Sequence, residues 1–545
     1  MKDRKPLVLI ILDGWGLAPA GPGNAITLAK TPNFNRYWIV YPHTQLACSG
    51  EAVGLPRGED GNSETGHLNL GAGNIVYQDL PRINMAVAEG TFFRLPAFLA
   101  AAEHVRKNNS ALHLMGLISD AGVHSQQSHL FALMRFAKDQ GLKRVFIHLF
   151  VDGRDSPPTS SLTYINNVQR EIEEIGIGEI STLIGRYFAM DRSYHWERIQ
   201  KAYNLLVLGK GRQALSVEQA INSSYEDGKT DEFIEPVVLV DEGGKPRGLI
   251  GDNDAVIFFN FRIDRPRQLT KAFILPDFEN LKPETTEFDP YAERYGMKQF
   301  EAPEGTTTFK RAKVLSNLFF ATMTQYEKGL PVNVAFSPVL VSMPTARILA
   351  ENEVRQLHIA ETEKFPHVTY FFNGGREEKF PGEDQVMINS PQISTYDLKP
   401  EMSLYQVTEE VLKRFKSGIY QFILVNFANP DMVGHTGVLK AAIKACEVTD
   451  ECLGKIVNSV LALDGTAVIT ADHGNVEEMI NLQTGEVDTE HSTNPVPFII
   501  VDKKFDRGGW VLPKGILADV APTIMNLMNI NKPTNMSGRD LLKAH

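Results

Sequence analysis

Short apolar runs in this sequence end repeatedly in residues that could do chemistry. LVLIIL leads into Asp13, and LHLMGLIS, VFIHLFV, VIFFNF, FILVNF and AVIT likewise lead into charged or imidazole side chains. Parallel strands of open α/β sheets bind ligands just beyond their carboxyl ends. A single such residue is more often a helix cap or a solvated loop charge, but the repetition predicts a shared functional site.

Aspartate and histidine dominate these positions near the N-terminus and in the last third of the chain. Carboxylates and imidazoles without thiolates suit Mn²⁺, Mg²⁺, Co²⁺ or Zn²⁺. Six such ligands are too many for one open catalytic site and fit two ions, an arrangement used in phosphoryl displacement. The alternative is a scatter of capping aspartates and core histidines. The candidate ligands are Asp13, Asp431, His435, Asp472, His473 and His491.

A glycine-bracketed turn, GNSETGH at 61–67, carries a candidate nucleophile, Ser63. Glycines allow a phosphate to approach the backbone, and the start of a helix offers free N–H donors. A serine hydroxyl needs a base or a metal ion to become a good nucleophile, and the Asp/His set would supply the metal. As a lone motif, Ser63 is better explained as an N-capping serine.

Arginines are concentrated in the middle of the chain. The planar guanidinium binds carboxylate or phosphate in a bidentate way, so several converging arginines would hold a small anion. Asp155 could take a proton from a substrate hydroxyl or merely pair with an arginine, and surface salt bridges are the alternative for any one arginine. Arg262 and Arg265 could share a helical face. The candidates are His124, Arg154, Asp155, Arg186, Arg192, Arg262 and Arg265.

Lys364 lies between Glu361 and a further apolar run, HVTYFF, which predicts another strand. A lysine at this position could neutralise a phosphoryl group as it moves between oxygens. An exposed run of charges at a helix end is the alternative.

Buried apolar runs that alternate with helical periodicity predict an α/β fold of two domains. The division into an Asp/His-rich and an Arg-rich region predicts a discontinuous metal-binding domain, 1–77 and 312–545, with a substrate-binding domain, 78–311, inserted in it. Linkers near 79–82 and 302–308 would act as hinges. The charged stretch 282–299 is predicted to be a surface excursion.

Composition narrows the class of protein. A chain of 545 residues with net charge −11 is not expected to bind nucleic acid or a membrane surface. The apolar segment 7–12 is too short to span a membrane, and no signal-peptide pattern follows it, so we expect a cytoplasmic protein. Three cysteines without a C-x-x-C pair predict reduced thiols, with Cys446 a buried structural one. A monomer is expected.

Longer motifs resemble the cofactor-independent phosphoglycerate mutases of the alkaline phosphatase superfamily. They include DGWG at 13–16, GNSETGHLNLGAG at 61–73, VDGRDSPP at 151–158, FNFRIDRPRQ at 259–268, ANPDMVGHTG at 428–437, TADHGN at 470–475 and HSTNPVPF at 491–498. The matches run in order from end to end. The resemblance implies an alkaline-phosphatase-like metal domain with an inserted substrate-handling domain.

The resemblance also implies roles for individual residues. One metal ion would take Asp13, Ser63, Asp472 and His473, and the other would take Asp431, His435 and His491. The substrate would be held by His124, Arg154, Asp155, Arg186, Arg192, Arg262 and Arg265, with Lys364 on the phosphate. The stretch 289–341 and the residues 193–196 depart from the family pattern.

The implied reaction transfers the phosphoryl group of 3-phosphoglycerate to Ser63 and returns it to the 2-hydroxyl, from which Asp155 takes the proton. No 2,3-bisphosphoglycerate would be needed, and closure of the two domains would keep water out. A phosphopentomutase or metal-dependent phosphatase of the same superfamily is the nearest alternative. An inactive metal- or phosphate-binding module is an alternative from another class.

Overall fold

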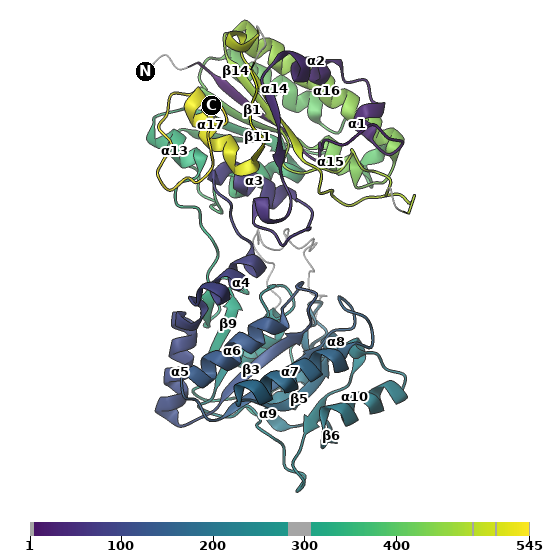
Figure 1. The fold of residues 1–545 in the computed structure, drawn as a ribbon, viewed down its shortest axis with the longest axis vertical. Coiled ribbons are helices and arrows are strands. Elements are labelled where there is room, and N and C mark those ends of the chain that lie inside the picture. Colours follow the sequence, from purple (N-terminus) through teal and green to yellow (C-terminus); the bar gives the residue numbers. More distant parts are fainter. Residues whose placement is uncertain (1–4, 282–306, 482–483, 507–509, 544–545) are drawn as a thin grey trace. The chain divides into compact units, whose positions relative to one another are not determined.

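The computed structural model describes residues 5–281, 307–481, 484–506 and 510–543. The chain divides into two compact units, residues 1–78 with 339–545 and residues 79–338. Figure 1 shows the first unit built from both ends of the chain and the second from its middle. The predicted surface excursion at 282–299 lies outside the described residues.

The first unit is built on a mixed sheet of eight strands among the described residues, in the order β12-β11-β13-β1-β14-β15-β2-β16. β1 pairs in parallel with β13 and β14, whereas β15 runs antiparallel to β14 and β2. The strands are β1 (Leu7–Leu12), β2 (His43–Ala47), β11 (Gln356–Glu361), β12 (Glu383–Ile388), β13 (Phe422–Phe427), β14 (Thr466–Thr470), β15 (Val496–Val501) and β16 (Gly515–Ile516).

Helices cover both faces of this sheet. Figure 1 shows α2, α14 and α16 on one side and α3, α13 and α17 on the other. Because the central strands are covered twice, β1 is buried along its whole length, which explains its uninterrupted apolar sequence. The helices are α1 (Ala25–Leu28), α2 (Pro32–Val40), α3 (Ser63–Ala72), α13 (Thr345–Glu351), α14 (Leu404–Lys416), α15 (Asn429–Gly434), α16 (Leu439–Ala462) and α17 (Val520–Leu527).

The second unit contains another eight-stranded sheet within the described residues, in the order β10-β9-β8-β3-β4-β5-β7-β6. It is parallel from β10 to β5, and β7 runs antiparallel to β5. The strands are β3 (Leu112–Ile118), β4 (Val145–Val151), β5 (Glu179–Gly185), β6 (Arg212–Ala214), β7 (Val237–Leu239), β8 (Ala255–Phe258), β9 (Phe319–Thr324) and β10 (Asn333–Phe336).

The helices of this unit are α4 (Asp79–Glu89), α5 (Pro96–Asn108), α6 (Gln127–Asp139), α7 (Ser161–Ile175), α8 (Arg186–Ala189), α9 (Trp196–Leu208), α10 (Val217–Glu226) and α11 (Arg267–Ile274). Helices α4 and α5 precede the first strand of this unit, and the later helices lie between its strands, as crossover connections require. The α/β fold class is thereby confirmed, and the six apolar runs that introduced the candidate site all contribute strands.

Two structural predictions were wrong. The second domain boundary falls at 338/339 and not at 311/312, because β9 pairs with β8 and therefore belongs to the inserted unit. The run HVTYFF does not form a strand, since His367–Phe371 is a helical turn, and Val368 and Phe372 of the run pack into the core. A short apolar run has no periodicity that separates a buried strand from a buried helical segment.

No described helix is both long and apolar enough to cross a membrane. The cysteines Cys48, Cys446 and Cys452 are free and buried. Cys446 lies on the inner face of α16, where burial raises the pKa of its thiol, as expected for a structural residue.

Candidate functional site

The predicted Asp/His set comes together at the carboxyl ends of the central strands in the first unit. Asp13 directly follows β1, Asp431 lies in α15 just after β13, and Asp472 and His473 follow β14. Because β13, β1 and β14 are neighbouring parallel strands, their ends meet at one edge of the sheet. His491 comes from the loop before β15, which pairs with β14.

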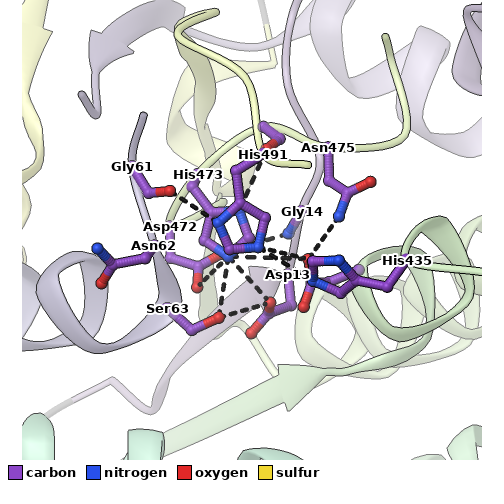
Figure 2. A network of polar contacts seen from close by, with 12 residues as sticks. Asp13, Gly14, Gly61, Asn62, Ser63, His435, Asp472, His473, Asn475 and His491 are labelled. Carbon is purple, nitrogen blue, oxygen red and sulfur yellow. Dashed lines mark hydrogen bonds and ion pairs between the residues drawn. The ribbon is translucent and has the colours of Figure 1, made fainter. Parts of the chain in front are cut away.

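Three imidazoles converge here, and each is oriented by the backbone. The Nδ1 atoms of His435, His473 and His491 donate to the carbonyl oxygens of Thr489, Gly474 and Gly61, at 2.8, 3.2 and 2.8 Å. A carbonyl oxygen only accepts, so Nδ1 donates in each contact and Nε2 is left to bind a proton or a cation. Figure 2 shows the three rings turned toward one another above Asp13 and Ser63.

The ring nitrogens and carboxylates form two adjoining groups around Asp431. The Nε2 atoms of His435 and His491 lie 3.3 and 3.4 Å from Asp431 Oδ1. His473 Nε2 lies 3.5 Å from Asp13 Oδ1 and 3.5 Å from Asp472 Oδ2. Asp431, His435 and His491 lie close enough to share one cation, and Asp13, Asp431 and His473 lie close enough to share another.

Lys364 supplies the positive charge of this cluster. Its Nζ donates to Asp13 Oδ1 and Asp431 Oδ2, both at 2.7 Å. Burial would raise the pKa of both carboxyl groups, but Lys364 holds each well below its usual range. Burial would also lower the pKa of Lys364, yet Asp13 and Asp431 raise it above its ordinary value. The side chain is buried, which rules out the exposed charge run as its explanation.

The imidazole pKa values also reflect the surrounding carboxylates. Burial would lower the pKa of His473, but Asp472 and Asp431 raise it to about 10. Asp431 raises the pKa of His435, whereas burial and His473 lower that of His491. The metal-free cluster therefore retains a proton that a cation would displace.

Ser63 opens α3 with its hydroxyl directed into the same cluster. Asn62, not Ser63, is the N-cap, because the Asn62 side chain accepts from Thr65 N at 2.9 Å. The Ser63 hydroxyl is therefore free to donate to Asp13 Oδ1 at 3.3 Å, and it lies 2.9 Å from His473 Nε2. Lys364 Nζ donates to Ser63 Oγ at 2.6 Å.

The donor set fits divalent cations. His435 Nε2 and His491 Nε2 lie 3.1 Å apart, an unfavourable approach of two lone pairs unless a proton or cation lies between them. Asp472 Oδ2 is buried and accepts no hydrogen bond from any described residue. Three buried carboxylates, Asp13, Asp431 and Asp472, lie beside Lys364 and His473, and added cations would balance the remaining negative charge.

Sequence reasoning did not identify His67 as part of this cluster. Its Nδ1 lies 3.2 Å from Asp472 Oδ2, and its ring is fully buried. The available signal was its position in α3, one helical turn after Ser63, which places both residues on one face of the helix.

The arginine-rich candidates gather in the second unit around buried carboxylates. Asp264 accepts from Arg192 at 2.7 Å and from Arg262 at 3.1 Å, and it lies 3.7 Å from His124 Nδ1. Burial lowers the pKa of His124 well below its ordinary value. Asp264 itself was not predicted. Arg262 and Arg265 precede α11, so they lie in a loop and not on the helical face that their spacing suggested.

Asp155 and Arg186 extend this network. Arg186 is buried and donates to Asp155 Oδ2 at 2.5 Å and to Asp152 Oδ1 at 2.6 Å. His124 Nε2 lies 3.7 Å from the same Asp155 oxygen. The carboxylate of Asp155 is therefore held in place but still partly exposed.

A cavity of about 350 Å³ opens beside this network. Arg154, Arg192 and Arg265 line it, and Arg154 pairs with Glu232 at 3.5 Å. Burial, with Arg186 and Arg192, lowers the pKa of Arg265 to about 10, so an anion here would meet partly desolvated cations.

Two further lining residues were not predicted from the sequence. The Arg198 guanidinium lies 3.9 Å from the centroid of the Tyr187 ring and bonds Asp191 at 3.1 Å. Tyr187 lies within the segment GRYFAMDR at 185–192 and Arg198 six residues after it, beside the predicted Arg186 and Arg192, which was the available signal. The cavity therefore presents four arginines and can accept a small, strongly anionic molecule.

The fold and the cluster define a class of protein, the metal-dependent enzymes built on an α/β sheet. The family model of the metalloenzyme superfamily matches residues 5–532. The relatives are more specific. A 2,3-bisphosphoglycerate-independent phosphoglycerate mutase of Chloroflexus aggregans is 50% identical over 545 residues, 99% of each chain. One of Clostridium acetobutylicum is 48% identical over 541 residues, which covers 99% of this chain and 100% of the relative.

The chain belongs to the family of 2,3-bisphosphoglycerate-independent phosphoglycerate mutases. A crystal structure of Leishmania mexicana phosphoglycerate mutase, obtained at low cobalt concentration, matches with a TM-score of 0.60 and 31% identity over 99% of this chain and 98% of that one. The family resemblance recognised in the motifs is thus confirmed. The relatives favour a mutase over the phosphopentomutase and phosphatase alternatives.

Proposed function

We propose that this chain interconverts 3-phosphoglycerate and 2-phosphoglycerate through a phosphoserine at Ser63, with two divalent cations and without 2,3-bisphosphoglycerate. The observation that carries the proposal is the Ser63 hydroxyl, which lies among Asp13, His473 and Lys364 with no capping duty of its own. The choice of phosphoglycerate as substrate is supported by relatives about half identical in sequence, which are named phosphoglycerate mutases.

One cation would be held by Asp13, Ser63, Asp472 and His473, and the other by Asp431, His435 and His491. When bound, such ions lower the pKa of a serine hydroxyl and neutralise phosphoryl oxygens. Mn²⁺ is the favoured ion, with Mg²⁺, Co²⁺ and Zn²⁺ as alternatives, because the donors are oxygen and nitrogen atoms. The cobalt named for the Leishmania mexicana enzyme supports a divalent cation but does not select Mn²⁺ among them.

In the proposed first step Ser63 Oγ gives up its proton and forms a bond to phosphorus as the bond to O3 of the substrate breaks, and O3 takes up a proton to leave glycerate. The Lys364 ammonium, 2.6 Å from Ser63 Oγ, would neutralise the phosphoryl oxygens.

In the second step the 2-hydroxyl of glycerate attacks phosphorus, and the bond to Ser63 Oγ breaks. Asp155 would accept the hydroxyl proton, with Arg186 and His124 fixing its orientation. The carboxylate of glycerate would be gripped by arginines drawn from Arg154, Arg192, Arg262 and Arg265. Two in-line displacements leave the configuration at phosphorus retained.

The test is the conversion of 3-phosphoglycerate to 2-phosphoglycerate by chelator-stripped protein, with no 2,3-bisphosphoglycerate present. Activity should return with Mn²⁺ alone, and Mg²⁺, Co²⁺ and Zn²⁺ are compared in parallel. Protein that binds Mn²⁺ but does not isomerise the substrate would contradict the proposal, and pentose phosphates would then be assayed. The cytoplasmic location and monomeric state stay predictions.

A further inference from the structure

Asn426 links the central strands to the predicted ligand Asp13. It lies near the end of β13 and pairs in register with Ile11 of β1, two residues before Asp13. Its Nδ2 donates to Asp13 Oδ2 at 2.6 Å and to His67 Nε2 at 3.0 Å. The reverse amide orientation would place an oxygen against the Asp13 carboxylate, so the contact itself fixes the orientation.

His67 continues this link to the backbone of the proposed nucleophile. An amide nitrogen only donates, so His67 Nε2 accepts and Nδ1 carries the ring proton. Nδ1 donates to the carbonyl oxygen of Ser63 at 2.8 Å and lies 3.2 Å from Asp472 Oδ2. Two uncharged side chains therefore connect Asp13 with Ser63 and contact Asp472.

Asn426 does not satisfy its own hydrogen-bonding needs at this position. Its Oδ1 is buried and has no hydrogen-bond partner among the described residues. A leucine of similar shape would avoid that cost, so the asparagine is better explained by what it holds than by core packing. Asn426 holds Oδ2 of Asp13. This leaves Oδ1 of Asp13 facing Ser63 Oγ at 3.3 Å.

We propose that Asn426 and His67 are positioning residues for the cation site formed by Asp13, Ser63, Asp472 and His473. Asn426 fixes Oδ2 of Asp13, and His67 fixes the backbone carbonyl of Ser63. Together they would set the distances between the ligand atoms that face the ion. Partners that orient metal ligands typically contribute about 10-fold to 100-fold in metal affinity. The inference rests on the proposed function, because it assumes that this set holds an ion.

The other ligand set provides a matched control. Asn475 is also buried, and its Nδ2 donates to Asp431 Oδ1 at 2.9 Å. Asn426 and Asn475 thus make the same contact with a carboxylate of different sets. If the asparagines were purely structural, replacing either one should affect the two ions alike. The proposed role instead predicts that each replacement weakens the binding of one particular ion.

The experiment titrates the chelator-stripped full chain with Mn²⁺ and follows free Mn²⁺ by electron paramagnetic resonance. The wild-type chain should bind two ions. Asn426→Leu should weaken the ion that Asp472→Asn also weakens, by about 10-fold to 100-fold. Asn475→Leu should instead weaken the ion that His435→Ala weakens. His67→Asn keeps a donor near the Ser63 carbonyl but has no atom at the position of Nε2 to accept from Asn426, so it should behave as Asn426→Leu does.

Circular dichroism and the melting temperature without metal test whether each variant is folded. If Asn426→Leu is not folded, His67→Asn is compared with the wild type in its place. A wild-type chain that binds no Mn²⁺ would reject the proposed function. This inference alone would be rejected if the wild type binds two ions and the Asn426 and His67 variants bind both ions as tightly as the wild type does. It would also be rejected if these variants weaken both ions to the same extent.

Discussion

The ammonium nitrogen of Lys364 lies 2.6 Å from the hydroxyl oxygen of Ser63. The same nitrogen donates to Asp13 and Asp431, one carboxylate from each proposed ligand set. Lys364 is thus the shared contact of the nucleophile and both sets. In the metal-free protein it neutralises charge that the cations would otherwise balance.

Replacing Lys364 by methionine should destabilise the metal-free protein by about 3–5 kcal/mol, because Asp13 and Asp431 would remain buried without their partner. Mn²⁺ should restore more stability to this variant than it adds to the wild type, although mutase activity should stay low. Thermal unfolding with and without Mn²⁺ measures both effects.

The control for this variant is Lys455→Met, which removes an exposed i,i+4 pair with Glu451. Exposed pairs contribute little, so the melting temperature should hardly change. Equal melting temperatures for the metal-free wild type and Lys364→Met would show that Lys364 does not balance the buried carboxylates.

Ser63→Ala should abolish isomerisation and leave the fold intact. Wild-type protein mixed with 3-phosphoglycerate labelled at phosphorus should retain label on the chain after denaturation, whereas the variant should retain none. Ser49→Ala serves as the control, since its hydroxyl only donates to the Thr493 carbonyl. Label on the Ser63→Ala chain would rule out this serine as the nucleophile.

Arg265→Ala should raise KM for 3-phosphoglycerate about 10-fold or more, the usual range for losing a charged hydrogen bond to an anion. Arg265 lines the cavity and is partly desolvated, so it would contact the substrate strongly. Arg135→Ala removes only a surface contact with Glu171 and should leave KM unchanged. Steady-state kinetics decides, and similar KM values for both variants would place Arg265 outside the substrate site.

Glu361 gives the clearest dependence of stability on pH. It ends β11, is 1% exposed, and accepts from Ser403 N at 3.0 Å and Ser390 Oγ at 3.1 Å. Burial raises the pKa of its carboxyl group from 4.5 to about 7. The folded state therefore binds this proton more tightly than the unfolded chain does, and stability from this group falls as pH rises from 4.5 through 7.

Glu361→Gln should accordingly be more stable than the wild type at pH 8, by up to about 3 kcal/mol. The difference should shrink as pH falls and vanish about one pH unit below 4.5, where the wild-type side chain is neutral in the folded and the unfolded chain. Unfolding by urea at several pH values measures it. A difference that does not vary with pH would mean that Glu361 does not titrate in this range.

Much of the site could be predicted because strand ends in a parallel sheet are readable from sequence. Asp13, Asp431 and Asp472 each follow an apolar run, and the order of the strands brings these ends together. Ser63 stood out for its glycines. The residue types alone were enough to predict metal ligands among the aspartates and a nucleophile at the serine.

Other contacts depend on distant parts of the chain and left no local signal. Lys364 pairs with Asp13 across 351 residues, and its side chain was equally compatible with an exposed helix end. His67 looks like an ordinary helical residue until Asn426 is placed beside it. Asp264 contacts Arg192, Arg262 and His124. An acidic residue among arginines in a sequence is also typical of an exposed surface, so its type alone did not indicate a site.

The order in which the chain is synthesised bears on how the first unit forms. Residues 79–338 are continuous and can fold as soon as they leave the ribosome, whereas Asp13 contacts Asn426 across 413 residues. At 5–20 residues per second, β1 waits about 20 to 80 s for β13. A strand that ends up fully buried therefore spends that interval without its neighbours, and the ligand cluster is completed only when the last third of the chain has emerged.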